Sequence, residues 1–397
     1  MKRDTAKVGA ATYLQALIAA APARSSELGP TSHPFKRKEI EVTDIWTRTR
    51  IGAIEVSNRL AMAPMTRSRA QYDGTPGPLA AEYYSQRASL GLIITEGTQP
   101  SDDGQGYTLT PGIYTDAHVM GWKEITDAVH AKDSHIFIQL MHVGRTSHPD
   151  NTPHHRQALA PSAIAPKDQI FTPTGFQAVP EPREMSADDI HQAIADFRYA
   201  GKRAIEAGAD GVEIHGANGY LIQQFFAPNA NRRTDAFGGT IENRARFAIE
   251  VAKAVADEIG PERTGIRLSP GATLGGLDEG SYGPDLYRYL VGELDKLGLA
   301  YVHVMHLGNE SLLADIRKLW HRALIVNRPG RALADIGADI VNGLADIESY
   351  GQFTLANPDF PERLKKGANM NPADRMSYFG GDAKGFIDYP TLEQATA

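Results

Sequence analysis

The chain of 397 residues contains no cysteine. Disulfide bonds, iron–sulfur clusters and thiolate zinc sites are therefore excluded. A reducing compartment is compatible with this absence, although secreted proteins can also lack cysteine. The sequence also has no apolar run near the roughly 20 residues that a membrane-spanning helix needs, so no membrane partner is expected.

A basic excess is missing as well. Lys and Arg number 41 against 48 Asp and Glu, which gives a net charge of −7. This balance argues against nucleic acid or an anionic membrane as the main partner. With 42% hydrophobic and 22% charged residues, the composition is that of an ordinary globular protein. The length allows one large α/β domain or two or three small ones.

The first 43 residues carry little information. They begin Met1-Lys-Arg and pass through an alanine-rich stretch to Ala21-Pro-Ala23, an order that resembles a secretory signal. Tyr13 and Gln15 interrupt the apolar stretch. We therefore expect residues 1–43 to be an irregular N-terminal extension, and the protein to be cytoplasmic.

Eight short apolar runs alternate with helical patterns along the rest of the chain. They are rich in Ile, Leu and Val, as expected for strands buried on both faces. The runs are Leu60–Met65, Gly91–Gly97, His135–Met141, Gly211–Gly216, Thr264–Pro270, Tyr301–His306, Arg322–Asn327 and Asp346–Gly351. This order predicts an α/β fold, a single (β/α)8 TIM barrel over residues 44–397.

Local patterns predict what surrounds the barrel. Residues 50–59 are expected to form a hairpin that caps its bottom. Ser186 and Asp189 have the spacing of a capping box, which predicts a helix that starts there and ends at Gly208. The proline-rich segment 142–184 follows the third strand and is long for a strand-to-helix connection, so we expect a lid over the barrel mouth.

The most informative stretch is Gly211-Val-Glu-Ile-His215-Gly-Ala-Asn218-Gly-Tyr220. It places a histidine, an asparagine and a tyrosine within six residues, directly after a predicted strand. Two hydrogen-bond donors and a phenol suit a site that holds a polarised oxygen and delivers a proton. His215 alone would more often be a buried structural histidine, so the interpretation depends on its companions.

Those companions are Thr66, Gln139 and Arg267, which lie within or at the end of other apolar runs. The carboxyl ends of barrel strands meet at the face where active sites are built. Because unpaired polar groups are costly to bury, a polar, partly anionic ligand would satisfy all of them. Each also has a plainer explanation: Thr66 as a loop hydroxyl, Gln139 on nearby backbone, and Arg267 paired with Glu213.

The block continues through Gln223-Gln-Phe-Phe-Ala-Pro-Asn-Ala-Asn-Arg-Arg-Thr-Asp-Ala-Phe-Gly-Gly-Thr-Ile-Glu-Asn-Arg244. Read together, it resembles the old yellow enzyme family of flavin-dependent ene-reductases, and the resemblance covers most of residues 44–393. It implies non-covalent FMN that NADPH or NADH reduces as a transient reductant. The acceptor would be an α,β-unsaturated carbonyl or nitro compound. The absence of a G-x-G-x-x-G fingerprint fits a nicotinamide that docks only transiently.

The resemblance also implies which residues contact the flavin. Pro64, Met65 and Thr66 would line it, Gly97 would lie beside the ring, and His215 would face both cofactor and substrate. Gln139 would bond the pyrimidine ring and Arg267 would lie beside N1 and O2. There a guanidinium stabilises the charge of the reduced flavin.

For the substrate, the resemblance implies that His215 and Asn218 bond the carbonyl or nitro oxygen. Hydride would pass from flavin N5 to the β-carbon, and Tyr220 would give a proton to the α-carbon. A phenol with a pKa of about 10 is protonated at neutral pH and can act as an acid.

Three further residues would line the substrate pocket: Tyr107, Met141 and Phe379. Many relatives have tryptophan at Met141 and tyrosine at Phe379. Because methionine is smaller and more adaptable than tryptophan, we expect a wider or differently shaped pocket.

The phosphate end departs from the family pattern. Gln352 stands where many relatives have an arginine that grips the FMN phosphate. We expect the backbone of Gly330 to approach the phosphate, and Arg331 or Arg328 to replace the missing charge.

Two other functions remain open. The same barrel could reduce nitrate esters or nitroaromatics, because the same oxygen-binding pair serves both reactions. A flavin-free barrel acting as a binding protein is supported only by Gln352. No metal is expected, since His142, His148, His154 and His155 match no zinc spacing. The oligomeric state is not predicted.

Overall fold

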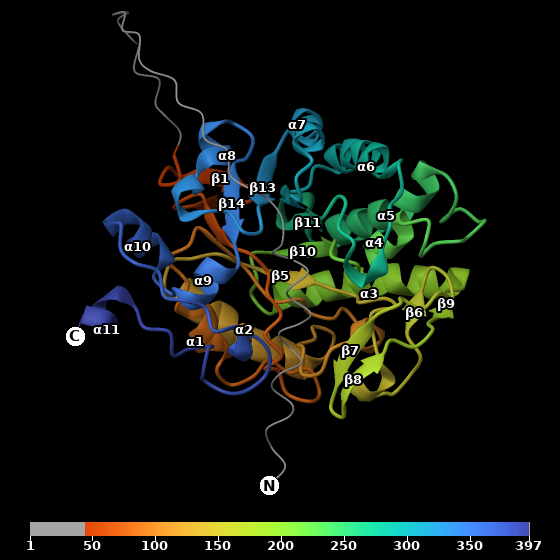
Figure 1. The fold of residues 1–397 in the computed structure, drawn as a ribbon, viewed down its shortest axis with the longest axis horizontal. Helices are drawn as coiled ribbons and strands as arrows, with labels where there is room; N and C mark the ends of the chain where they lie inside the picture. Colours follow the sequence, from red (N-terminus) through yellow and green to blue (C-terminus); the bar gives the residue numbers. More distant parts are fainter. Residues whose placement is uncertain (1–43, 397) are drawn as a thin grey trace, which may run out of the picture.

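The computed structural model describes residues 44–396, so the extension expected over residues 1–43 lies outside the described residues. A closed barrel of eight parallel strands occupies the centre, in the order β10-β11-β12-β13-β14-β3-β4-β5 (Figure 1). These strands are β3 (Leu60–Met62), β4 (Leu92–Ile94), β5 (Ile136–Leu140), β10 (Gly211–Gly216), β11 (Thr264–Leu268), β12 (Tyr301–Met305), β13 (Ala323–Asn327) and β14 (Ile347–Tyr350). All eight predicted strands and the predicted fold are thereby confirmed.

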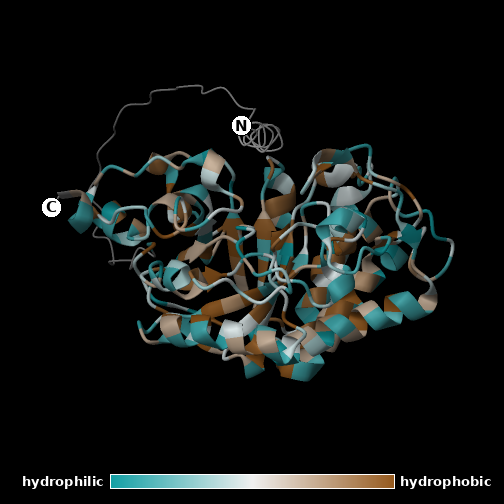
Figure 2. Ribbon diagram, turned by 90° about the horizontal axis from the view of Figure 1, so that it is seen from below, coloured by the Kyte–Doolittle hydropathy of each residue, from teal (hydrophilic) through white to brown (hydrophobic). Residues whose placement is uncertain are grey.

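Helices connect the strands and cover the outside of the barrel. They are α1 (Ala80–Ser85), α2 (Asp116–His130), α3 (Ala187–Glu206), α4 (Leu221–Phe226), α5 (Ile241–Ile259), α6 (Gly283–Leu297), α7 (Glu310–Leu319), α8 (Ala338–Val341), α9 (Gln352–Ala356), α10 (Phe360–Lys366) and α11 (Leu392–Thr396). Short 3-10 turns cover Asp102–Gly104, Pro149–Asn151, Pro261–Arg263, Leu274–Gly276, Leu333–Asp335 and Arg375–Ser377. Hydrophobic residues gather on the central strands, while many outward helix positions are hydrophilic (Figure 2).

Helix α3 begins where the sequence predicts. The Ser186 hydroxyl accepts from the Asp189 backbone N–H at 3.1 Å, and the Asp189 carboxylate accepts from the Ser186 N–H at 2.7 Å. This reciprocal pair is a capping box, and it satisfies two backbone donors that the helix leaves open. Gly208 follows the helix with a φ of +90°, a conformation that favours glycine, so the predicted helix end is confirmed too.

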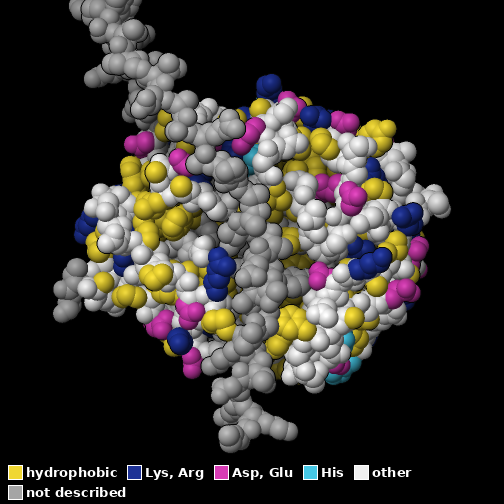
Figure 3. Space-filling view, in the orientation of Figure 1, with side chains coloured by type: hydrophobic (Ala, Val, Ile, Leu, Met, Phe, Trp, Pro, Cys, Tyr) yellow, Lys and Arg dark blue, Asp and Glu magenta, His cyan; other side chains and the backbone are white. Residues whose placement is uncertain are grey.

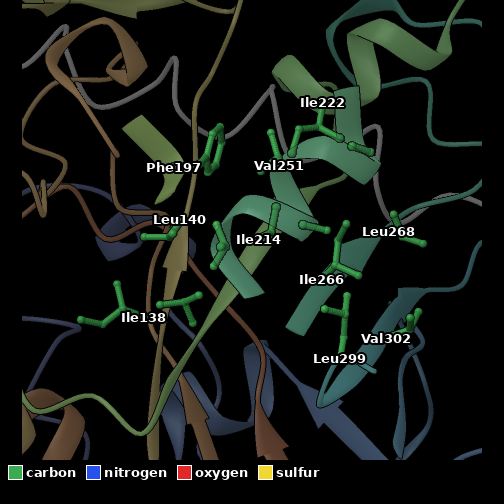
Figure 4. Packing of buried hydrophobic residues seen from close by; sticks show 14 of the residues in the cluster. Ile138, Leu140, Phe197, Ile214, Ile222, Val251, Ile266, Leu268, Leu299 and Val302 are labelled. Carbon is green, nitrogen blue, oxygen red and sulfur yellow. The ribbon is translucent and has the colours of Figure 1, made fainter. Parts of the chain in front are cut away.

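Two apolar layers hold the barrel together. Outward residues of the strands pack against the helices, with Ile214, Ile266 and Leu140 among those that meet Phe197 of α3 and Val251 of α5 in one cluster (Figure 4). Inward residues of the lower barrel form a second cluster with the hairpin of β1 (Thr49–Ile51) and β2 (Ile54–Val56). The predicted hairpin thus closes the bottom of the barrel with apolar side chains.

The segment after β5 carries structure of its own. β7 (Gln169–Thr172) and β8 (Gly175–Ala178) form an antiparallel hairpin, and β6 (Leu159–Ala160) pairs with β9 (Arg183–Glu184). Asn151 donates to the backbone of both Gly106 and Phe171, at 3.0 and 2.9 Å. This side chain ties the hairpin to the loop that carries Tyr107. A role as a lid stays a prediction.

The surface agrees with the charge balance. On the face shown in Figure 3, basic and acidic side chains are intermingled rather than gathered by sign. Within residues 44–396, no helix combines the length and the apolar character needed to cross a membrane.

Candidate active site at the barrel mouth

The upper barrel interior is lined by polar side chains at inward positions of neighbouring strands. Gln139 on β5 lies level with Glu213 on β10, and His215 on β10 lies level with Arg267 on β11. All four are at most 4% exposed. Successive strand residues alternate between the two faces, so residues two apart, such as Glu213 and His215, share the interior.

Arg267 has buried hydrogen-bonding capacity to spare. One terminal nitrogen donates to the side-chain oxygen of Asn327 at 3.3 Å. Its Nε and its other terminal nitrogen are buried and have no hydrogen-bond partner among residues 44–396. Burial lowers the pKa of Arg267, and Glu213 opposes that change. Because unpaired buried donors are costly, these two nitrogens indicate a ligand with acceptor atoms.

The sequence also allowed Arg267 to pair directly with Glu213. In the structure, Glu213 is hydrogen-bonded to Gln139 and His303 instead. The Glu213 carboxylate accepts from Gln139 Nε2 at 2.8 Å and lies 2.8 Å from His303 Nδ1. On its far side, His303 Nε2 lies 2.8 Å from the Ser349 hydroxyl. Sequence reasoning missed His303 and Ser349. The alternation along β12 could have indicated His303, because Tyr301, His303 and Met305 occupy its inward positions.

His215 is poised to donate rather than to carry charge. Its Nδ1 accepts from the Ala217 backbone N–H at 3.3 Å, which leaves the proton of the neutral ring on Nε2. Burial lowers the pKa of His215 well below its usual range, and Arg267 and His303 lower it further. The ring is therefore neutral at physiological pH, and its Nε2–H can bond an oxygen.

Tyr220 stands beside His215 at the mouth. The two rings meet edge-on, with centroids 5.0 Å apart. The hydroxyl oxygen of Tyr220 lies 3.2 Å from that of Tyr107. Burial raises the pKa of Tyr220, and the hydrogen bond with Tyr107 only partly offsets this. The phenol thus keeps its proton over the ordinary pH range.

The backbone between these residues is strained and held in place. Asn218 has a φ of +57° and Gly219 one of +86°. Left-handed conformations are costly for a residue with a side chain, so neighbouring contacts must stabilise them. The Asn218 N–H donates to Ser269 Oγ at 2.8 Å, and the Gly219 N–H donates to Gln223 Oε1 at 2.8 Å. A methyl group on Gly219 would lie 2.4 Å from the Leu274 carbonyl oxygen, so only glycine fits.

Met141 and Gly97 are in contact at the ends of the neighbouring strands β5 and β4. A methyl group added to Gly97 would lie 2.5 Å from Met141 Sδ, so the glycine makes room for the methionine. The segment Pro64–Thr66 follows β3 and is half-buried. Next to it, the Gly380 N–H donates to the Arg67 carbonyl at 2.9 Å, which brings the C-terminal segment with Phe379 alongside. Phe379 is 45% exposed.

The expected phosphate end holds a dense ion cluster. Arg331 forms ion pairs with Asp339 and Glu348, both buried. Arg328 pairs with Asp339 at 2.8 Å and with Glu310 at 2.6 Å. A phosphate would therefore have to share these arginines with carboxylates.

The remaining sequence candidates lie at the edge of this cluster or away from it. Gly330 is exposed and has a φ of +77°. Gln352 donates to the Tyr378 hydroxyl at 3.0 Å rather than joining the arginines. Among residues 44–396, no three His, Asp or Glu side chains are grouped as metal ligands would be.

The fold and the mouth together define an enzyme of the (β/α)8 barrel class that binds a ligand rich in hydrogen-bond acceptors. A sequence profile of the NADH:flavin oxidoreductase / NADH oxidase family matches residues 44–371. The chain is 42% identical over 375 residues to 12-oxophytodienoate reductase 1 of Oryza sativa subsp. japonica, covering 91% of this chain and 96% of that protein. It is 40% identical to chanoclavine-I aldehyde reductase of Penicillium roqueforti, with 88% and 96% covered.

Solved structures agree with these sequence relatives. Morphinone reductase superimposes with a TM-score of 0.85 at 40% identity, covering 91% of this chain and 99% of that one. Its complex with tetrahydroNAD gives 0.84 at 41% identity, with 89% and 99% covered. The chain belongs to the old yellow enzyme family of NADH:flavin oxidoreductases. It is an FMN-dependent, nicotinamide-dependent ene-reductase.

The interior of the barrel fits this cofactor. The two unpartnered nitrogens of Arg267 supply donors to the acceptor atoms of a flavin ring. The amino group of Gln139 is taken by Glu213, which leaves its carbonyl oxygen as an acceptor for a ring N–H. Between the two strands that carry these groups, His215 presents one further donor.

Proposed function

We propose that His215, Asn218 and Tyr220 are the residues that act on the substrate when this ene-reductase reduces the C=C bond of an α,β-unsaturated carbonyl or nitro compound. When bound, FMN supplies the hydride to the β-carbon. The observation that carries the proposal is the geometry at the mouth: His215 Nδ1 accepts from the Ala217 N–H, which leaves Nε2 to donate, and the Tyr220 ring meets the His215 ring edge-on.

The division of labour follows from the chemistry of each group. Donors from His215 and Asn218 withdraw electron density onto the substrate oxygen, which makes the β-carbon electrophilic. Tyr220 then gives its proton to the α-carbon as a general acid. Its raised pKa keeps the proton available until that step.

Six residues are proposed to hold the flavin together with His215. Gln139 and Arg267 bond the ring edge from inside the barrel, and their burial supports this assignment. Pro64, Met65, Thr66 and Gly97 line its faces and edge. Polar contacts that are fixed before the cofactor arrives need no rearrangement on binding.

The substrate class is proposed from the residues assigned to the pocket wall and from the relatives. Tyr107, Met141 and Phe379 are assigned to the pocket wall. The relatives named above include reductases of 12-oxophytodienoate and morphinone, which supports bulky cyclic enones as acceptors. Methionine in place of a large aromatic side chain favours the same choice.

NADPH is proposed as the reductant, docking in the same pocket that the enone later enters. The test is the visible absorption spectrum of the purified protein, before and after anaerobic NADPH and then after a cyclic enone. Flavin bands that bleach and return support the proposal. Bands that bleach but return only with a nitrate ester or a nitroaromatic would contradict it, and so would a colourless protein that FMN does not colour.

We further propose that Arg331, with Gly330 beside it, supplies the phosphate contact that Gln352 cannot make. The test compares the affinities of the apoprotein for FMN and for riboflavin, which lacks the phosphate. In Arg331→Ala, FMN affinity should fall while riboflavin affinity stays the same. Riboflavin is thus an internal control for damage to the ion cluster. Arg328→Ala is the matched variant, and full FMN affinity in Arg331→Ala contradicts the assignment.

A further inference from the structure

A chain of hydrogen bonds crosses the barrel interior and begins at Gln139, one of the residues assigned to the flavin. It runs from Gln139 on β5 through Glu213 on β10 and His303 on β12 to Ser349 on β14, with each contact at 2.8 Å. Glu213 and His303 are fully buried. A carboxylate in such a place is costly unless it is paired and hydrogen-bonded, so its presence calls for a reason.

Glu213 and Arg267 carry opposite charges in this layer. Burial raises the pKa of Glu213, but His303, Arg267 and the bond from Gln139 outweigh it, so the pKa lies below its usual value. Burial lowers the pKa of His303, and Arg267 lowers it further against the opposing effect of Glu213. Arg267 acts electrostatically on both groups, so the Arg267 guanidinium and the Glu213 carboxylate are an opposite-charge pair in this layer.

Glu213 also fixes the direction of the Gln139 side chain. An ionised carboxylate can only accept hydrogen bonds, so it selects the amino group of the amide. This directs the carbonyl oxygen of Gln139 away from Glu213, where it can accept from a ligand. A neutral or apolar residue at position 213 would not impose this choice in the same way.

We propose that Glu213 is a positioning and charge-balancing residue for the flavin, which orients Gln139 and offsets the positive charge of Arg267. The consequence is a flavin that is harder to reduce than Arg267 alone would make it, because reduction adds negative charge beside a cation that is already partly neutralised. This inference rests on the proposed placement of FMN against Gln139 and Arg267.

Glu213→Gln removes the charge and can keep the hydrogen bonds. The new carbonyl oxygen accepts from Gln139, and the new amino group donates to His303 Nδ1. His303 then carries its proton on Nε2 and donates to the Ser349 hydroxyl. Ser349→Ala is the matched control, because it shortens the same hydrogen-bond chain at its far end without changing any charge.

The experiment measures the midpoint potential of the FMN-loaded proteins by anaerobic spectral titration. FMN affinity and the thermal unfolding of each apoprotein are measured alongside. In Glu213→Gln, the ratio of reduced to oxidised flavin at a fixed potential should rise at least about tenfold, or about 30 mV for a two-electron couple. Ser349→Ala should leave the potential unchanged. An unchanged potential in a folded, FMN-loaded Glu213→Gln, or an equal shift in Ser349→Ala, would overturn the inference.

The outcome is independent of the substrate assignment. If the wild type binds FMN but reduces no enone, and the potential shifts in Glu213→Gln, this inference is supported and the proposed function is refuted. If the wild type reduces enones and the potential does not shift in Glu213→Gln, the proposed function is supported and this inference is refuted.

Discussion

Replacing Tyr220 by phenylalanine tests the proposed proton donor with little disturbance of the fold. The change deletes one hydroxyl, which donates a 3.2 Å hydrogen bond to the hydroxyl of Tyr107. Losing a bond of this kind costs about 1 kcal/mol of stability, so the variant should fold. A positioned general acid contributes roughly 10²- to 10⁴-fold to a rate. The loss should therefore be about 3 to 5 kcal/mol of barrier stabilisation.

Stopped-flow measurement separates the two half-reactions. Reduction by NADPH should proceed at nearly the wild-type rate in Tyr220→Phe, since no proton from Tyr220 is needed. Reoxidation by a cyclic enone should slow by the factor above. Tyr107→Phe is the matched control. It removes the hydrogen-bond partner of Tyr220 but leaves the proposed proton donor in place, so it should slow reoxidation far less. Equal slowing of both half-reactions, or reoxidation within about threefold of wild type, would refute the assignment.

Further predictions concern pH and stability. Because burial raises the pKa of Tyr220, the reoxidation rate should show no alkaline loss from this group below about pH 10. Gly97→Ala should lower thermal stability by about 1–3 kcal/mol through overpacking against Met141, and adding Met141→Ala should recover part of it; strictly additive effects in thermal melts would contradict this contact. Asp210→Asn should lower the melting temperature more at pH 6 than at pH 9. The hydrogen bond to Asp210 raises the pKa of His135, so the pair's contribution fades as pH rises through that pKa, and equal losses at both pH values would count against it.

At low pH, the stability that the Asp210–His135 pair contributes depends on the carboxylate, and it is lost as pH falls rather than as it rises. Burial raises the pKa of Asp210, but its hydrogen bonds to His135 and His130 outweigh this, and the pKa falls below its usual value. Its contribution is therefore present above about pH 4 and is lost as pH falls further. The window in which both partners are charged lies between these limits, and pH 6 falls inside it.

The fold could be predicted from the sequence because eight short, largely apolar runs alternate with helical patterns along the chain. Part of the candidate active site could also be predicted, because His215, Asn218 and Tyr220 follow one another on a single strand and the loop after it. Their geometry supports the roles that the family resemblance implies. Residues that lie close in sequence need little knowledge of the fold to be brought together.

The side-chain contacts across the barrel could not be predicted from the sequence. The sequence offered Arg267 as the partner of Glu213, whereas the structure gives His303, which lies 90 residues further along the chain. Which inward side chains meet depends on the stagger between strands, and single residues do not encode it. The partners of Arg331 were missed for a similar reason, since Glu348 and Asp339 reach it from a strand and a helix that follow later.

The ion cluster beside β14 also constrains how this protein can change by mutation. Glu348 and Tyr350 occupy outward positions on β14, facing Arg331 and α8, where other barrel strands have apolar side chains against the helices. An apolar residue in place of Glu348 would remove a buried partner of Arg331, and loss of Arg331 would strand the carboxylate. Either single step is penalised, whereas both together can be neutral. The two positions should therefore be varied jointly in any library, because one-at-a-time scanning would score each as intolerant.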